Sequence, residues 1–391
     1  MKSSTRAIAA AVAVAIAPRL LLAADAPAAP APPVPGLSDL LTAWGLNVSG
    51  DIAASYYHSN GYPGSEWRGF DEDHDSLQLD EAGLQVAYQP KSGVGGFVDV
   101  ITGTDAQILD ENESLKVAPG GGTYSSSASA VDVRQAYLQY ATGNLTVIAG
   151  KFVTLAGAEV INPTGNTNFS RSLLFWELEP LDHTGVRATY AATGTLTFSV
   201  GVNNGWNYTD LSTSGAKTGE FNATWTPNKV VSLAVTGYFG KDDVLFDGQQ
   251  LSLIDFVGTY NVTSQLTLIL NADFKQASGD GITGTDATQH WNGFAGYANY
   301  GFNDKWRVSI RGEYYNVVGA GHAFEGTGTV GYSPVKNLEL RAELRYDKLS
   351  DGLATLGYDY VRTADPDGTP TSYAANNLEF ALQGVYKFSL P

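Results

Sequence analysis

The charged side chains that could act on a solute fall into two groups in this 391-residue sequence. The first group lies in and just after the segment 155–180 and consists of Glu159, Arg171, Glu177, Glu179, Asp182 and Arg187. The second group is basic and consists of Lys275, Arg307, Arg311, Arg341 and Arg345. Acids that face bases across a water-filled space set up a transverse electric field, and rings of charge are a general means of selecting ions. We therefore expect these residues to order charged and polar solutes.

A simpler interpretation is that these charges only keep a surface hydrated and pair with their neighbours. Arg341, for example, lies two residues from both Glu339 and Glu343. Residues two apart on a strand share one face, so either acid could be its partner. Both interpretations stay open at the level of sequence.

The sequence offers little for catalysis or for binding a metal or cofactor. His183 is better explained as a hydrogen-bonding residue at the end of a loop. The other histidines lack metal-ligand spacing: His58, His74, His290 and His322. No nucleophile elbow, phosphate loop or His-Glu-x-x-His motif occurs. The acidic run at 70–75 lacks the spacing and terminal glutamate of a calcium loop. We expect no enzyme activity, no cofactor and no metal site.

The elements that position the charges are indicated by strict alternation along the chain. In the segment 338–347, one set of alternate positions is Leu338, Leu340, Ala342, Leu344 and Tyr346. The positions between them are Glu339, Arg341, Glu343, Arg345 and Asp347. A strand directs successive side chains to opposite faces, so one face is apolar and the other is charged. The same pattern recurs at 264–275, 304–315 and 378–390.

About sixteen such segments, each of roughly ten residues, match the length of a tilted membrane-spanning strand. They start near 45, 75, 93, 131, 144, 181, 194, 216, 229, 249, 264, 288, 304, 323, 336 and 374. Short turns alternate with long loops. The short turns are 90–92, 142–144, 193–194, 227–229, 263–264, 303–304 and 334–336. The long loops are 60–74, 105–130, 155–180, 207–215, 241–248, 277–287, 317–322 and 349–373.

These patterns predict an all-β fold, a closed transmembrane antiparallel barrel with short periplasmic turns and long extracellular loops. The apolar face would meet lipid and the charged face would line a wet lumen. The barrel must be closed, because an open edge would leave backbone polar groups unbonded in lipid. Aromatic residues near strand ends fit interfacial girdles: Tyr56, Tyr88, Tyr140, Tyr190, Trp225, Tyr260, Trp306 and Tyr332. A soluble sandwich or propeller is the alternative, but neither needs short and long loops to alternate.

The N-terminus predicts export. Residues 1–24 combine Lys2 and Arg6 with an apolar run and small residues, as in a Sec signal peptide cut near Ala24 or Ala26; a short N-terminal anchor is the alternative. Residues 25–44 form an Ala/Pro-rich linker and a short N-terminal segment, and 45–391 form the barrel. Cleavage removes three cations and no acid, so the net charge moves from −17 to −20, which disfavours nucleic-acid binding. Without cysteine, the exported fold has no disulfides.

Residues 150–187, followed by NNGWN at 203–207, resemble the OmpL-like beta-barrel porin family, beta-barrel porin-2. The matching elements are Gly150-Lys151-Phe152, Glu159, the segment 168–172 (NFSRS) and the segment 180–185 (PLDHTG). The resemblance implies a channel in the bacterial outer membrane. In porins generally, the third long loop folds into the lumen, and here that loop is 155–180.

The expected function is passive diffusion of small hydrophilic solutes and ions, because sixteen strands leave an aqueous channel. Outer-membrane lipid, lipopolysaccharide and these solutes are the expected partners, and assembly into a homo-oligomer stays open. One alternative is a substrate-selective channel, for sugars for example, with Trp176 or Trp206 contributing to an aromatic track. A barrel-embedded hydrolase, with His322 at the rim, is a weaker alternative.

Overall fold

The computed structural model describes residues 36–60, 69–70, 75–114, 130–207, 217–242, 249–279, 288–353, 360–364 and 370–390. The predicted signal peptide, most of the predicted linker and most of the acidic run at 70–75 lie outside these ranges. Within the predicted segment 25–44, residues 37–44 form a helix, α1.

Sixteen strands form one closed antiparallel barrel, in the spatial order β1-β18-β15-β14-β13-β12-β11-β10-β9-β8-β7-β6-β5-β4-β3-β2. The bounds of the barrel strands are β1 (Asn47–Ser59), β2 (Leu77–Tyr88), β3 (Gly93–Thr102), β4 (Val131–Thr142), β5 (Leu145–Val153), β6 (Asp182–Ala191), β7 (Leu196–Asn203), β8 (Thr218–Trp225), β9 (Val231–Asp242), β10 (Gln249–Asn261), β11 (Leu266–Ser278), β12 (Thr288–Gly301), β13 (Trp306–Val317), β14 (Gly321–Val335), β15 (Leu338–Leu349) and β18 (Asn376–Leu390). Every predicted segment is a strand, and each begins within two residues of its predicted start. The predicted sixteen-stranded barrel is confirmed.

The barrel closes where the first and last strands pair, with Val48 opposite Leu390 and Ser59 opposite Glu379. Consecutive strands otherwise form hairpins, and short and long connections alternate as predicted, with one exception. The connection at 317–322, predicted to be a long loop, is a turn of residues 318–320. Gly319 adopts a φ of 84°, and the Ala320 N–H donates to the Val317 carbonyl at 3.0 Å. This tight turn joins β13 and β14 directly, so both strands run on to residues 317 and 321.

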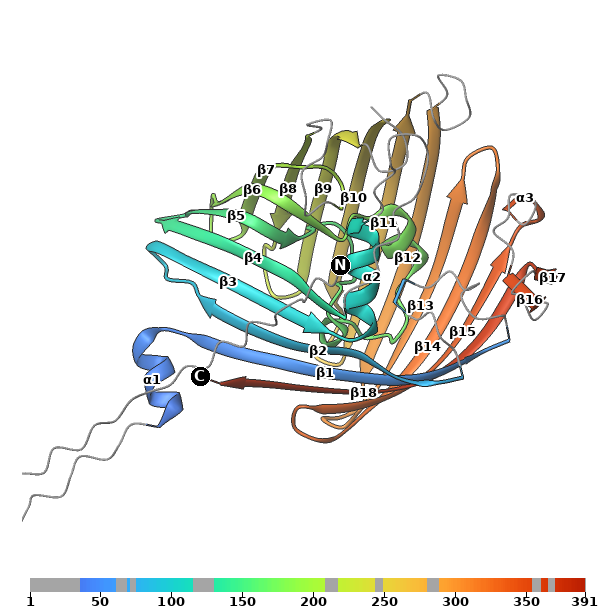
Figure 1. Ribbon diagram of the computed structural model, residues 1–391, viewed down its shortest axis with the longest axis horizontal. Helices are drawn as coiled ribbons and strands as arrows, with labels where there is room; N and C mark the ends of the chain where they lie inside the picture. The colour runs from blue at the N-terminus through green and yellow to red at the C-terminus, as the bar shows by residue number, and fades with distance from the viewer. Residues whose placement is uncertain are drawn as a thin grey trace, which may run out of the picture.

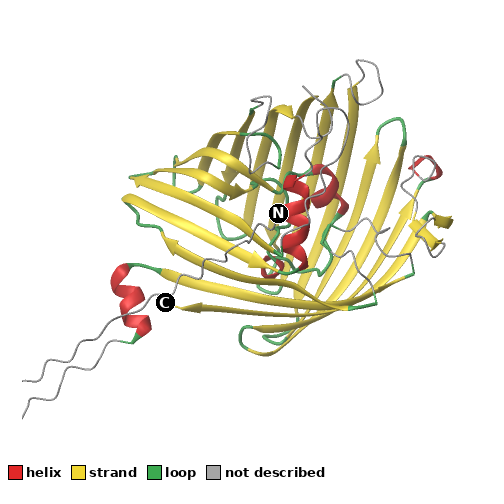
Figure 2. Cartoon of the chain, in the orientation of Figure 1, coloured by secondary structure: helices red, strands yellow, loops and turns green. Residues whose placement is uncertain are grey.

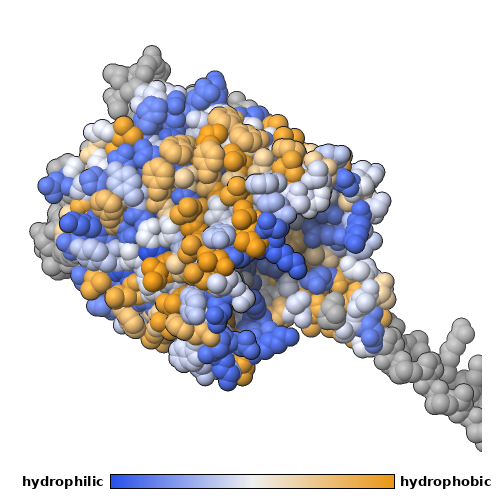
Figure 3. Space-filling view, turned by 180° about the vertical axis from the view of Figure 1, so that it is seen from behind, coloured by the Kyte–Doolittle hydropathy of each residue, from blue (hydrophilic) through white to orange (hydrophobic). Residues whose placement is uncertain are grey.

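The side chains alternate between a lipid-facing and a lumen-facing surface. On β15, Leu340 and Leu344 are exposed on the outside, while Arg341, Glu343 and Arg345 are buried on the inside. Apolar residues gather over much of the outer face in the view of Figure 3. Most of the predicted girdle residues lie at the short-turn ends of strands, and these are half exposed: Tyr88, Tyr140, Tyr190, Trp225, Tyr260 and Trp306.

The remaining elements are short and lie in the long connections. They are α2 (Thr104–Ser114), η1 (Pro163–Gly165), η2 (Leu174–Leu178), α3 (Asp351–Leu353) and a small sheet of β16 (Tyr360–Ala364) and β17 (Pro370–Ala374). In Figures 1 and 2, α2 and η2 lie within the curve of the barrel wall. None of the helices among the described residues has the length and hydropathy needed to cross a bilayer.

The alternation on β15 yields a test of which face meets lipid. Leu340→Arg should weaken insertion, because a cation on a barrel's lipid face costs about 2–4 kcal/mol at mid-bilayer depth and less toward the interface, where Leu340 pairs with Tyr332. Arg341→Leu, one residue along, places no charge in lipid, so the barrel should still insert even though this buried side chain loses its bonds to the inward loop. The fraction of each variant that inserts into lipid vesicles is the measurement, and equal losses of insertion would contradict the assignment of the faces.

Candidate functional site

The loop between β5 and β6, residues 155–180, crosses the interior of the barrel and is called the inward loop below. It contacts the wall at several places around the ring. The Ala158 N–H donates to Asn271 on β11 at 2.7 Å, Asn168 donates to Thr329 on β14 at 2.7 Å, and Asn162 donates to Asp51 on β1 at 3.0 Å. The loop thus spans from β11 to β1 and reduces the open cross-section.

Side chains of the inward loop fix its own turns. Asn162 Oδ1 accepts the Thr164 N–H at 2.7 Å at the start of η1. The Asn166 amide donates to the Val160 carbonyl at 2.7 Å. The buried Arg171 guanidinium donates to the carbonyls of Val160, Ile161 and Phe169. These bonds satisfy backbone groups that cannot reach water.

Arg311 on β13 is the main charged contact between wall and loop. Its Nη1 lies 2.7 Å from Glu159 Oε1 and 2.7 Å from the Ser170 carbonyl. On the wall side, its Nε lies 3.1 Å from Glu325 on β14. Glu313, on the same strand, lies 3.7 Å away. Arg311 is only 1% exposed, so this guanidinium depends on its carboxylate partners.

The other predicted wall arginines also bind loop carbonyls. Arg307 donates to Thr167 O at 2.6 Å, Arg341 donates to Asn166 O at 2.9 Å, and Arg345 donates to Arg171 O at 2.6 Å. Their acidic partners lie on β15: Glu339 for Arg307 and Arg341, and Asp347 for Arg345. The pairing of Arg341 with Glu339, one of the two predicted alternatives, is therefore present.

Wall glutamates receive the amide groups of the same loop. Glu343 accepts the Phe169 N–H at 2.6 Å and the Ser170 N–H at 2.9 Å. Glu313 accepts the Leu173 N–H at 2.9 Å. Arginines therefore bind the loop carbonyls while glutamates bind the loop amides. Neither acid was among the predicted site residues, although both share a strand face with predicted arginines.

Asp182 and Arg187, at the end of the loop and on β6, pair with wall residues. Asp182 lies 3.4 Å from Lys151, which also contacts Asp132 at 3.3 Å. Arg187 lies 2.6 Å from Glu220 on β8, and its guanidinium stacks 4.2 Å above the Phe152 ring. The inner face of β4–β8 thus holds a lysine between two aspartates and an arginine–glutamate pair.

Glu177, Glu179 and Lys275 lie where the inward loop meets β11. The Lys275 ammonium donates to the Glu177 carbonyl at 2.8 Å. Burial raises the pKa of the Glu177 carboxyl, although the Lys275 charge acts in the opposite direction. Burial, together with the neighbouring Asp255 carboxylate, holds the pKa of Glu179 well above its ordinary value.

The π-helical turn η2 has apolar contacts on two sides. Leu173, Leu174 and Leu178 pack in a buried cluster with residues of β12–β14, including Tyr297 and Tyr315. Phe175 packs in a second cluster with Ile101, Ile108 and Leu109, which belong to β3 and α2. The apolar contacts place α2 against the inward loop, inside the barrel (Figure 1).

Three cavities lie beside the inward loop, and the smallest, of about 210 Å³, borders Thr164, Glu339 and Arg341 on the side of β14, β15 and β18. Another, of about 390 Å³, lies between the loop and the wall of β2–β4 and is lined by Gln85, Asp99, Arg134, Gln135, Glu159 and Asn162, among others. The third, of about 490 Å³, lies toward the short-turn end and is lined by Ser49, Asp51, Gln85, Thr164, Lys336 and Lys387, among others. Gln85 borders both of the larger cavities. In the wall, Arg134 pairs with Glu81 at 2.5 Å and with Asp99 at 2.8 Å.

The histidines considered for catalysis have mainly packing contacts. His183 is buried, stacks on Tyr238 with ring centroids 4.7 Å apart, and has its Nδ1 3.4 Å from the Gly205 carbonyl. The His322 ring lies among the rings of Tyr314 and Phe324.

Solved structures with a similar fold are outer-membrane proteins. The anion-selective porin from Comamonas acidovorans has a TM-score of 0.60 at 11% identity, with 88% of this chain and 99% of that chain covered. The outer membrane channel DcaP of Acinetobacter baumannii has a TM-score of 0.58 at 14% identity, with coverages of 88% and 97%. The trimer form of in-vitro folded OmpT from Vibrio cholerae has a TM-score of 0.57 at 13% identity, with coverages of 88% and 99%. Comparison with curated proteins found no match.

These likenesses show the fold, and the sequence itself shows the family. The profile of the OmpL-like beta-barrel porin-2 family matches residues 45–388, which is the whole barrel apart from its last residues. The chain therefore belongs to the OmpL-like beta-barrel porin-2 family and forms an outer-membrane channel for passive diffusion.

Proposed function

We propose that small hydrophilic solutes and ions pass between the inward loop and the part of the wall formed by β18 and β1–β4. The observation that carries this proposal is the pair of cavities that share Gln85. On the other side, the loop is bonded to β13–β15 through Arg311, Arg341 and Glu343. A solute that enters from the short-turn end would cross the larger cavity, pass Gln85 and reach the smaller one.

In this proposal, the predicted site residues have two roles. Arg307, Arg311, Arg341 and Arg345 position the inward loop, because each donates to a loop carbonyl. Glu159 borders the passage and also pairs with Arg311. The residues that meet the solute are mainly ones that the sequence reasoning did not select: Asp51, Gln85, Asp99, Arg134 and Asn162.

The lining supports general diffusion better than a sugar-specific track. Its charged and amide groups alternate, and the aromatic residues that border the two cavities are Phe175 and Phe388. Trp206 is instead buried against Tyr238, and Trp176 packs on Phe70. The described lining therefore lacks a continuous aromatic path. We further propose that transport involves no chemical step.

Release of the inward loop should widen the passage. In Glu343→Gln, both loop amides lose a charged acceptor: one keeps a neutral oxygen and the other faces an NH₂ group that cannot accept. A hydrogen bond to a charged group is worth about 1.5–3 kcal/mol. We expect a higher single-channel conductance and more open-state noise in a planar bilayer. Glu220→Gln makes the same substitution at the Arg187 pair on β8 and should leave conductance near that of the wild type. Equal conductance in wild type and Glu343→Gln would contradict a constricting role for the loop.

Ion preference should depend on charges at the junction of the two cavities. Asp51 lies in the larger cavity and contacts Asn162 of the inward loop. Asp51→Asn removes a negative charge from the passage and should therefore shift the reversal potential across a KCl gradient in the direction of anion preference. Asp304→Asn removes the same charge from an exposed turn and should shift it less. If the two substitutions change the reversal potential equally, the passage does not run past Asp51.

We also propose that the chain is exported through an N-terminal signal peptide, as the charges and apolar run at 1–24 predict. It assembles into a homo-oligomer, an inference supported by the similar fold of the OmpT trimer form. The mass of the refolded barrel in detergent, measured by light scattering, tests the second proposal, and a monomer mass would contradict it.

A further inference from the structure

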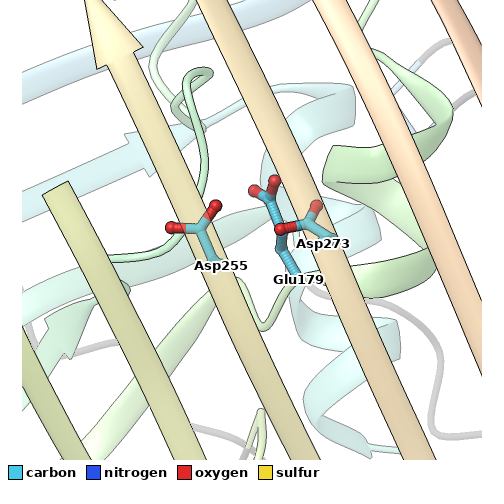
Figure 4. Close-up of side chains that lie close together, drawn as sticks. All are labelled: Glu179, Asp255 and Asp273. Atoms are coloured by element: carbon cyan, nitrogen blue, oxygen red, sulfur yellow. The ribbon is translucent and has the colours of Figure 1, made fainter. Parts of the chain in front are cut away.

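Three carboxylates from separate parts of the chain converge at the end of the inward loop. Glu179 ends the loop, while Asp255 on β10 and Asp273 on β11 are directly opposite each other in the register of these strands. One oxygen from each side chain lies within 4.8 Å of the other two. Figure 4 shows the three groups side by side on the inner face of the wall.

All three side chains are withdrawn from solvent, with exposed fractions of 3% for Glu179 and 0% for Asp255 and Asp273. Glu179 Oε2, Asp255 Oδ2 and Asp273 Oδ2 are buried and lack a hydrogen-bond partner among the described residues. None of the three forms an ion pair with a cation in the described part of the chain. A buried carboxylate oxygen without a donor is costly, and here three occur together.

The surrounding groups hold these oxygens in place without neutralising them. The Asn271 amide donates to Asp255 Oδ1 at 2.9 Å and to Asp273 Oδ1 at 3.3 Å, which occupies one oxygen of each aspartate. Gly157 has a φ of 86°, and a Cβ at this position would overlap Glu179 Oε2. The loop backbone can therefore approach the Glu179 carboxylate only because residue 157 is glycine. Lys275, which shares this strand face, binds the Glu177 carbonyl.

We propose that Glu179, Asp255 and Asp273 together bind one divalent cation, of which Ca²⁺ fits best. The donors are all carboxylate oxygens, the ligands that hard cations prefer, and no histidine or cysteine takes part. Ca²⁺ tolerates irregular oxygen sites better than Mg²⁺, which requires nearly ideal octahedral geometry. Water would complete the coordination.

A cation here would fasten the inward loop at a second place. Arg311, Arg341 and Glu343 hold the middle of the loop to β13–β15, whereas the cation would hold its end, next to η2, to β10 and β11. Sequence patterns do not reveal this site, because its ligands are separated by long stretches of chain and lack any known metal spacing.

The test uses the full mature chain refolded in detergent without lipopolysaccharide, whose phosphates also bind Ca²⁺. After treatment with EGTA, isothermal titration calorimetry with CaCl₂ should show one site per chain, and MgCl₂ should bind more weakly. Glu179→Gln and Asp273→Asn should each weaken Ca²⁺ binding by at least about tenfold, because affinity follows the number of charged ligands. Asp51→Asn, which neutralises another buried lumen acid, should leave the affinity unchanged.

Thermal unfolding provides a second measurement. At one Ca²⁺ concentration, the Tm of the wild type and of Asp51→Asn should rise more than that of Glu179→Gln, whose substitution lies outside the barrel strands and should spare folding. The proposal fails if the wild type shows no Ca²⁺ binding in the titration, or if Glu179→Gln and Asp273→Asn bind Ca²⁺ with the affinity of the wild type. It also fails if Glu179→Gln and Asp273→Asn have a higher Tm than the wild type by the same amount with and without Ca²⁺. That result would mean that protons shared among the carboxyl groups, and not a cation, neutralise them. None of these readouts depends on conduction.

Discussion

The structure depends on one constraint: in lipid, each backbone N–H and C=O of a strand must be bonded to another strand. The constraint forces the chain to close on itself, and the pairing of β1 with β18 completes the ring. Closure then fixes the direction of the side chains, because each strand must turn alternate residues outward to lipid and inward to the lumen. A one-residue slip in any strand would move its charges into lipid.

The same requirement recurs inside the lumen in another form. The inward loop is irregular, so much of its backbone cannot bond to itself, and much of it is buried. The wall supplies both kinds of partner: arginines such as Arg341 and Arg345 for carbonyls, and glutamates such as Glu313 and Glu343 for amides. Arginine suits this role because its planar guanidinium carries five donors, enough to bind a carboxylate and a carbonyl together. Charges on the wall therefore hold the loop as well as hydrate the barrel.

The strands were predictable because each one repeats the same binary signal several times, and β15 alone shows it over ten residues. The short turn at 318–320 was missed because turn length depends on local geometry at Gly319, which composition does not reveal. The predicted arginines do face the lumen, yet their contacts with loop carbonyls could not be inferred, because the path of the loop is set by tertiary packing. Asp255 and Asp273 were missed for a similar reason: alternation shows which way they point but not that Glu179 meets them.

These observations connect the anchoring of the loop to the position of the passage. The inward loop is bonded most densely to β13–β15, through groups that are mostly buried, and the cavity on that side is smaller than the two that share Gln85. Apolar packing of η2 against β12–β14, and of Phe175 against α2, fills a further part of the barrel interior. The two cavities that share Gln85 lie instead along β18 and β1–β4, where the wall also offers Asp99 and Arg134. The wall charges that bind the loop thus determine which other charges a solute meets, because they decide the side on which the lumen stays open.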